Sequence, residues 1–307
     1  MKRIRALRLV FLAAFGAACA PARPAPRPPA EAAEALPGAT VETGRRPRAG
    51  RGDVAYALYV PRAASGRPAP PWPAVVLAHG FGRSGKAHAA TSRDLAERGI
   101  VVLVPELVSL LGGDSARQAN VAGLRDDVAW LRARSARPGD ELSGLVDPAR
   151  IALAGFSAGG ALAFEAAAGT AVRAVVLLDA VPWKRTLEAA PGLPATRLLS
   201  LRSEPSACNS RGSVRRLLAS LRFGSDDVRI VGGTHCDAED PTDWLCRAAC
   251  GGTSGPARSA YRRLLYLFLS DALDAPPVDG SPGAWAEAVR RGVEDGSLVV
   301  ERIVPER

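Results

Sequence analysis

The stretch IALAGFSAGGALAFEAAAG, residues 151–169, decides the fold of this chain. It begins with apolar residues typical of a buried strand, passes through a serine among glycines, and continues as an alanine-rich segment typical of a helix. A strand that turns directly into a helix needs a sharp bend, and Gly155, Gly159 and Gly160 would allow it without Cβ clashes. Ser157 would then lie at the tip of a strained bend with its hydroxyl lifted away from the sheet, which suits a nucleophile.

Short apolar runs alternate with helical patterns along much of the chain, and no internal repeat is seen. We expect strands at residues 55–60, 74–78, 100–104, 151–154, 174–178, 198–201 and 228–231. We expect helices at residues 87–98, around 121–131, after Ser157, at 214–221 and at 260–273. Continuous apolar strands separated by helices indicate an α/β fold, with a mostly parallel sheet covered by helices on both faces.

Length and composition limit the classes of function. The chain has 307 residues, of which 47% are hydrophobic, enough for one large α/β domain or two small ones with a substantial core. The formal net charge is +9, but arginines supply almost all of the positive charge and are scattered along the chain. No basic helix is interleaved with aromatic residues, so we expect no nucleic-acid partner.

The first 19 residues have the pattern of a signal peptide. They combine a basic start, an apolar run at residues 7–15 that is too short to span a bilayer comfortably, and small residues that end at Cys19. The stretch GAAC resembles a bacterial lipobox, although Gly16 stands where leucine is commonest. We therefore expect export to the bacterial cell envelope, with the membrane contacted only through a lipid anchor at Cys19; ordinary secretion is the alternative.

The remaining chain divides into three parts by composition. Residues 20–39 are rich in proline and alanine and are predicted to form an extended linker. Residues 40–275 are predicted to form the catalytic α/β domain. The apolar pattern weakens beyond Pro276, so residues 276–307 are predicted to be a small C-terminal appendage.

Four further cysteines predict disulfide bonds: Cys208, Cys236, Cys246 and Cys250. An exported chain favours two disulfides, with three possible pairings. An i,i+4 bridge within one helix would be strained, so pairing across loops is expected rather than Cys246 with Cys250. Zinc binding by the closely spaced pair together with His235 is the alternative.

Gly155-Phe156-Ser157-Ala158-Gly159 matches G-x-S-x-G between a predicted strand and a predicted helix, which is the context that the nucleophile motif requires. A serine nucleophile needs a base, and we assign His235 because it follows the last strand and comes after both the serine and the available acids. His79 ends a strand, and His88 is interpreted as a surface residue at a helix start, facing solvent or the cleft.

The acid that orients the base has two candidates. Asp179 ends the apolar strand AVVLLD, and Glu204 follows the next strand; both would lie at the carboxyl edge of the sheet. We predict Asp179 and keep Glu204 open. Asp237 is too close to His235 to wrap round to its Nδ1, and residues 240–243 are interpreted as a helix start.

Acyl transfer also needs backbone donors for the oxyanion. We predict the amide of Ala158, directly after the nucleophile, and the amide of Phe81 in the HGFG turn at residues 79–82. Residues 183–194 and 108–120 are candidate flaps over the site, with solvent loops as the alternative.

Four motifs in this order resemble the α/β-hydrolase superfamily: HGFG at 79–82, GFSAGG at 155–160, LLDAVP at 177–182 and GGTHCD at 232–237. The resemblance covers about residues 56–273. More narrowly, the chain is similar to secreted serine esterases related to dienelactone hydrolases, cutinase-type polyester hydrolases and chlorophyllase-like proteins. The resemblance implies an α/β-hydrolase fold with an eight-stranded type of sheet, and it implies no cofactor and no metal.

Details of the motifs refine the expected function. Chlorophyllase-like proteins place their acid in a D-P-V stretch, and Asp179-Ala180-Val181-Pro182 is similar although the proline has moved. HGFG departs from the HGGG of many lipases, and a serine replaces the cysteine of dienelactone hydrolases. We predict a carboxylic ester hydrolase that acts on a small-molecule or polymeric ester through an acyl-enzyme. The alternatives are an amidase, thioesterase or peptidase with the same triad, or a non-catalytic surface lipoprotein that uses the scaffold for binding.

Overall fold

The structure is a computed structural model that describes residues 38–48, 52–63, 68–275 and 283–303. The predicted signal peptide with Cys19, and the predicted linker as far as residue 37, lie outside the described residues. Among the helices of the described ranges, none combines the length and the apolar character needed to cross a membrane.

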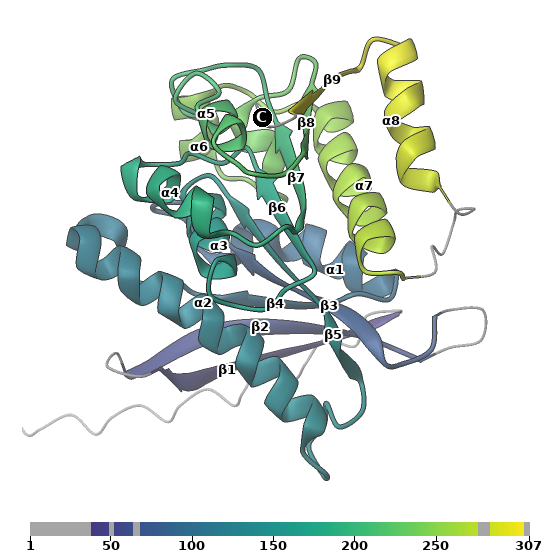
Figure 1. Cartoon of the computed structure of the whole chain (residues 1–307). Helices are drawn as coiled ribbons and strands as arrows, with labels where there is room; N and C mark the ends of the chain where they lie inside the picture. Colours follow the sequence, from purple (N-terminus) through teal and green to yellow (C-terminus); the bar gives the residue numbers. More distant parts are fainter. Residues whose placement is uncertain (1–37, 49–51, 64–67, 276–282, 304–307) are drawn as a thin grey trace, which may run out of the picture. The chain divides into compact units, whose positions relative to one another are not determined.

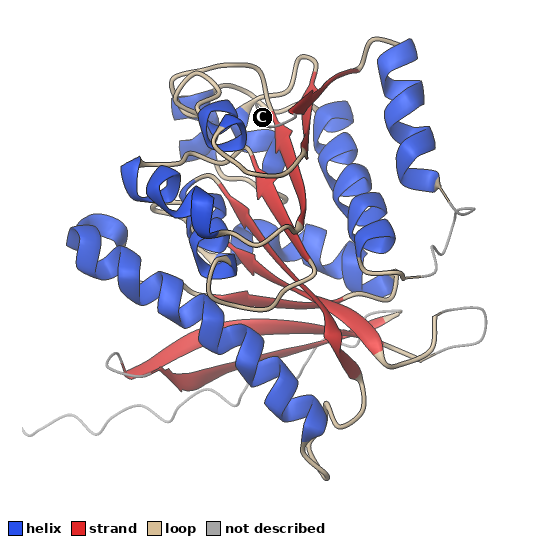
Figure 2. Cartoon of the chain, in the orientation of Figure 1, coloured by secondary structure: helices blue, strands red, loops and turns tan. Residues whose placement is uncertain are grey.

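A nine-stranded sheet forms the centre of the described chain (Figures 1 and 2). In chain order its strands are β1 (Ala39–Arg48), β2 (Gly52–Pro61), β3 (Trp72–Ala78), β4 (Val101–Pro105), β5 (Val146–Phe156), β6 (Ala174–Leu178), β7 (Arg197–Arg202), β8 (Ser225–Ile230) and β9 (Leu298–Ile303). Their order across the sheet is β1-β2-β4-β3-β5-β6-β7-β8-β9. The six central strands from β4 to β8 are parallel, whereas β1 and β2 at one edge and β9 at the other pair antiparallel.

The strand order places a topological switch point beside β3. The chain passes from β3 to β4 on one side and then returns to β5 on the other side. Ligands of open α/β sheets bind beyond the carboxyl ends of the strands at such a point. Residues that directly follow β3 and β5 are therefore brought together, and these are the HGFG turn and Ser157.

Helices cover both faces of the sheet (Figure 1). One core layer lies between the sheet and α1 (Ala89–Glu97), α7 (Gly255–Ala272) and α8 (Ala284–Glu294). The other lies between the sheet and α2 (Gly113–Ala136), α3 (Ala158–Ala167) and α5 (Val214–Ala219). The remaining short helices are η1 (Gly85–His88), η2 (Leu110–Gly112), α4 (Lys184–Ala189), η3 (Ala190–Gly192), η4 (His235–Ala238) and α6 (Trp244–Cys250). Fully buried strands with two covered faces explain the continuous apolar runs of the sequence.

Each predicted strand overlaps an observed one, and β6 has the predicted bounds. Strand β1 was not predicted, because its sequence ATVETGRRPR is polar and rich in arginine. Two of these arginines are nevertheless buried, since Arg46 and Arg48 both pair with Asp127 of α2. Long-range ion pairs therefore join α2 to a strand that lacks an apolar pattern of its own.

The C-terminal segment differs from the predicted appendage. Trp285 of α8 packs edge-on against Phe268 of α7, with ring centroids 5.3 Å apart. Strand β9 then pairs with β8 along its length and becomes the last strand of the sheet. Gly292 fits closely against Leu298, where a Cβ would lie 2.4 Å from the leucine side chain. The described part of this segment thus belongs to the α/β domain, and the short amphipathic pattern of α8 reflects its packing on α7.

Candidate active site

The turn between β5 and α3 is built from close backbone contacts. A Cβ on Gly155 would lie 2.3 Å from the carbonyl oxygen of Gly159, and a Cβ on Gly159 would lie 2.3 Å from that of His79. Ser157 has a φ of 54°, a conformation that costs energy in a non-glycine residue and is found at functional sites. Its amide donates to the carbonyl oxygen of Leu178, which ties the turn to the end of β6. The serine is held at the carboxyl edge of the sheet as the sequence indicated.

Three side chains that are distant in the sequence meet at this edge. The Nε2 atom of His235 lies 3.1 Å from the Oγ atom of Ser157, and its Nδ1 atom lies 2.6 Å from the Oδ2 atom of Asp179. Because a carboxylate only accepts hydrogen bonds, Nδ1 carries the proton and Nε2 is free to accept the serine proton. The ring of Phe156 contacts that of His235 at a centroid distance of 4.6 Å, with the two ring planes tilted by 40°.

Asp179 is buried and surrounded by donors. It follows β6 with a φ of 43° and is only 1% exposed. Ser203 donates its amide to Oδ1 at 2.9 Å and its hydroxyl to Oδ2 at 2.7 Å. The Nδ2 atom of Asn209 lies 3.2 Å from Oδ1. These bonds hold the carboxylate in the orientation that His235 needs. Sequence analysis missed Ser203 and Asn209, and the only signal was their position after the strand that neighbours β6.

Glu204, the alternative acid, and Asp237 have other partners. Glu204 turns its carboxylate toward the side chain of Arg229 and the amide of Gly232. Asp237 accepts from the amide and hydroxyl of Thr234, at 2.8 and 3.1 Å, and from the amide of Ser254 at 2.8 Å. The structure therefore brings Asp179, and neither of these residues, to the imidazole.

The residues of the two predicted oxyanion donors line the same cavity as Ser157. Phe81 and Ala158 both line it, and Phe81 is 54% exposed. In the part of the chain that the structure describes, neither amide donates a hydrogen bond to another protein group. The amide of Ala158 belongs to the first turn of α3, where the helix dipole favours negative charge. Both amides are thus available to an oxygen bound beside the serine.

The cavity over the serine has a volume of about 580 Å³. Its walls combine apolar surface from Val181 and Trp183 with polar groups from Arg117 and Arg185. The two candidate flaps of the sequence contribute to it: residues 183–194 form α4 and η3, and residues 108–120 form η2 and the first turns of α2. A cavity of this size, with a partly apolar lining, is typical of small-molecule sites in proteins.

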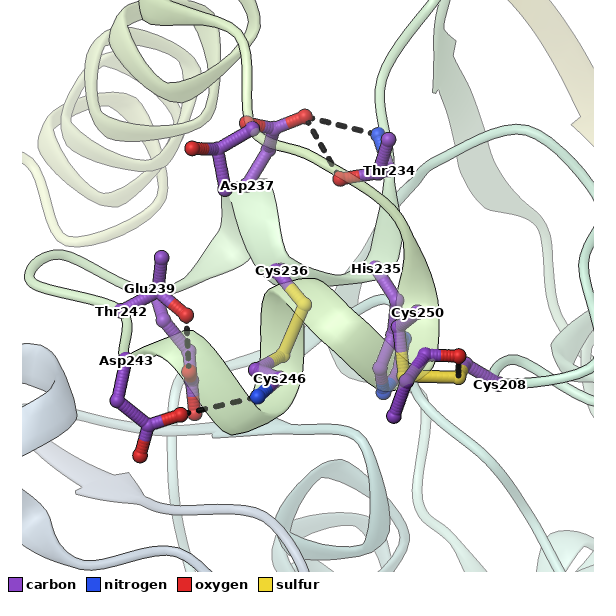
Figure 3. Close-up of a disulfide and its surroundings, with 12 residues drawn as sticks. Cys208, Thr234, His235, Cys236, Asp237, Glu239, Thr242, Asp243, Cys246 and Cys250 are labelled. Carbon is purple, nitrogen blue, oxygen red and sulfur yellow. Dashed lines mark hydrogen bonds between the residues drawn. A yellow bond between two sulfur atoms is a disulfide. The ribbon is translucent and has the colours of Figure 1, made fainter.

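The cysteines form two disulfides that flank His235 (Figure 3). Cys236 pairs with Cys246, and Cys208 pairs with Cys250. Cys246 and Cys250 share α6 and are each bonded elsewhere, so no bridge forms within the helix. The sulfur atoms of Cys236, Cys246 and Cys250 lie within 4.8 Å of one another, but zinc requires thiolates and all three are oxidised. The donor set therefore does not fit the zinc alternative.

The other histidines have separate roles. His79 accepts a hydrogen bond on Nε2 from the amide of Leu107 at 2.9 Å, which joins the HGFG turn to the loop after β4. His88 is fully buried, which corrects its interpretation as a surface residue. The segment that covers it is distant in sequence: Asp240 exchanges backbone hydrogen bonds with Ala87 and Ala90. Burial, together with the nearby His79 and Arg83, lowers the pKa of His88 to about 3.

A serine on a sharp strand-to-helix turn, followed along the chain by the aspartate and then the histidine that it meets at the carboxyl edge of a mostly parallel sheet, is the arrangement found in α/β hydrolases. The family model of the alpha/beta hydrolase family matches residues 75–302, which is most of the chain. The chain therefore belongs to the alpha/beta hydrolase family, and this membership confirms the predicted fold class and supports a hydrolase. No curated protein matches the chain.

Proposed function

We propose that this protein is a serine esterase that hydrolyses carboxylic esters through an acyl-enzyme. The observation that carries the proposal is the hydrogen-bonded series Ser157–His235–Asp179, of which Ser157 and His235 line a cavity of about 580 Å³. A hydroxyl with a hydrogen-bonded imidazole, itself oriented by a buried carboxylate, is the arrangement required for nucleophilic catalysis by serine.

The reaction proceeds in two steps. In the first, Nε2 of His235 takes the proton from Ser157 as Oγ attacks the ester carbonyl carbon, and the amides of Phe81 and Ala158 stabilise the oxyanion. The tetrahedral intermediate then collapses, and the imidazolium gives its proton to the departing alcohol. In the second step, water loses a proton to the same imidazole and attacks the acyl carbon. The bond between the acyl carbon and Oγ then breaks, the imidazolium returns its proton to Oγ, and the free acid leaves.

Esters are favoured over amides in this proposal by the chemistry of the leaving group and by the resemblance to serine esterases. Serine in place of the cysteine of dienelactone hydrolases supports simple ester hydrolysis, and an alkoxide leaving group needs less assistance than an amide nitrogen. Amidase, thioesterase and peptidase activities use the same three side chains, so the comparison among substrates decides between them.

A matched substrate panel tests the proposal. One acyl group is presented as its ester, thioester and amide to the wild-type protein and to Ser157→Ala and His235→Ala. We expect the highest kcat/KM for the ester, and a loss of about 10⁴-fold or more in both variants. Turnover that survives in Ser157→Ala, or a preference for the amide, would overturn the esterase proposal.

We also propose that the protein is exported to the cell envelope, anchored by a lipid at Cys19 or secreted. The pairing of all four described cysteines into disulfides supports an oxidising compartment. Metabolic labelling with a fatty-acid analogue tests the anchor, since Cys19→Ser would lose the label if Cys19 carries the lipid.

A further inference from the structure

A buried ion pair joins the HGFG turn to the histidine turn. Arg83 directs Nε and Nη2 to the two carboxylate oxygens of Glu239, each at 2.7 Å, and directs Nη1 to Asp243 at 2.8 Å. The side chain of Glu239 is fully buried and that of Arg83 is 12% exposed. Two parallel bonds between a guanidinium and a carboxylate fix the relative orientation of both groups, not only their distance.

The arginine closes the turn that carries one predicted oxyanion donor. Its amide donates to the carbonyl oxygen of Gly80 at 3.2 Å, so Phe81 and Gly82 are the two central residues of a β-turn. Gly82 has a φ of +65°, a left-handed conformation that favours glycine and that the third residue of a type II turn adopts. The direction of the Phe81 amide therefore depends on where Arg83 is held.

Glu239 in turn follows the base, His235, closely along the chain. His235 begins η4, and Glu239 is the residue that caps this single turn at its C-terminal end. The hydroxyl of Thr242 also donates to Glu239, at 3.0 Å, and Asp243 caps the start of α6 by accepting from the amide of Cys246 (Figure 3). The carboxylate is thus fixed within the element that positions the imidazole.

We propose that Arg83 and Glu239 are a positioning pair that sets the Phe81 amide relative to His235, so that oxyanion stabilisation and proton transfer act on one substrate geometry. The inference rests on the proposed function, because it assigns a role in the same site. A buried ion pair gives little net stability compared with apolar residues, since both charges lose their hydration. Its geometric constraint on two loops is the property that an apolar pair would not supply.

If the pair has this role, its disruption should cause a specific kinetic defect. Displacement of an oxyanion donor reduces the stabilisation of the transition state more than that of the bound substrate. As a result, kcat falls while KM changes little. We expect Glu239→Gln to lower kcat by about 10- to 100-fold. Arg83→Lys keeps the charge but loses the two-pronged geometry, and its kcat should fall between that of Glu239→Gln and that of the wild type.

A control separates this role from a loss of stability. Asp127→Asn breaks another fully buried carboxylate–arginine cluster, on α2 and β1, far along the sheet from β5. The variant Arg83→Gln/Glu239→Gln removes both charges and avoids an unpaired one, so it covers the case in which a single variant fails to fold. All proteins are assayed at a temperature where circular dichroism shows each to be folded.

Two readouts decide the inference. The first readout is catalytic competence, measured both as kcat and as the rate at which a fluorophosphonate labels Ser157. The second is the rate of backbone amide hydrogen exchange in residues 79–87. We expect Glu239→Gln and the double variant to lose both catalysis and protection in this turn, while Asp127→Asn keeps both. Unchanged kcat, or unchanged exchange in the turn, would overturn the positioning role. A wild-type protein that is not labelled would refute the esterase proposal instead, and hydrogen exchange would still decide whether the pair fixes the turn.

Discussion

The nucleophile side and the histidine side of the site are held in place by different means. In residues 151–169, backbone packs directly against backbone, and Gly155 and Gly159 leave no room for a side chain. In residues 232–254, the chain is held by two disulfides and by an arginine 156 positions away from its partner. The difference teaches that a short motif can specify the position of the serine, whereas the position of the imidazole depends on cross-links between distant segments.

Replacement of Asp179, the acid that orients His235, gives the largest expected effect. Asp179→Asn can still form a hydrogen bond with His235, but its amide group can donate to Nδ1. This favours the tautomer with the proton on Nε2, which cannot accept the serine proton, so we expect kcat to fall by about 10⁴-fold. Glu204→Gln, in which the partner of Arg229 loses its charge, is the matched control and should keep kcat within about threefold. Steady-state kinetics on one ester measure both, and equal losses in the two variants would remove Asp179 from its assigned role.

The nucleophile side is tested by adding one methyl group. Gly159→Ala would place a Cβ 2.3 Å from the carbonyl oxygen of His79, so the turn must shift and misplace Ser157. We expect kcat to fall by about 100-fold or more. In Gly192→Ala the new Cβ meets no atom within 4 Å, and activity should be retained. A fully active Gly159→Ala would show that close backbone contact does not hold the serine.

The two disulfides are expected to differ in what they stabilise. Loop-closure entropy predicts that Cys208–Cys250, with a separation of 42, contributes about 4 kcal/mol to the free energy of unfolding. Cys236–Cys246, with a separation of 10, should contribute about 3 kcal/mol. Its paired Ser variant should nevertheless lose more kcat, because Cys236 directly follows His235. Urea unfolding and kinetics of both paired Ser variants compare the two, and the reverse order in kcat would contradict the role given to the shorter bridge.

The smallest effect concerns the histidine buried between the two sides. The folded-state pKa of His88, about 3, lies below the ordinary value of 6.5, so the unfolded chain binds the additional proton as the pH falls through this range. The contribution of neutral, buried His88 to the free energy of unfolding is therefore complete above the unfolded-state pKa. It is lost as the pH falls from that value toward the folded-state pKa. Between about pH 7 and about pH 4.5 the loss should be about 2 to 3 kcal/mol. His88→Leu should flatten this part of the pH profile of unfolding; an unchanged profile would refute the assignment.

The contrast also explains what the sequence could predict. The parallel sheet, the serine turn and His235 follow local patterns, namely apolar runs, glycine spacing and chain order. The polar strand β1 and the role of α8 and β9 depend on partners elsewhere, such as Asp127 and Phe268. The choice between two acids needed the positions of their donors and counter-ions. Nothing in the residues around Arg83 indicated that its partner would be Glu239.

The most direct measurement of the central claim is the site of reaction with a fluorophosphonate. Intact mass and peptide mapping of the labelled wild-type protein should find one adduct per chain, on Ser157. Labelling should vanish in Ser157→Ala, slow strongly in His235→Ala and continue in Glu204→Gln. A folded wild-type protein that remains unlabelled, or that carries its adduct on another residue, would contradict the account.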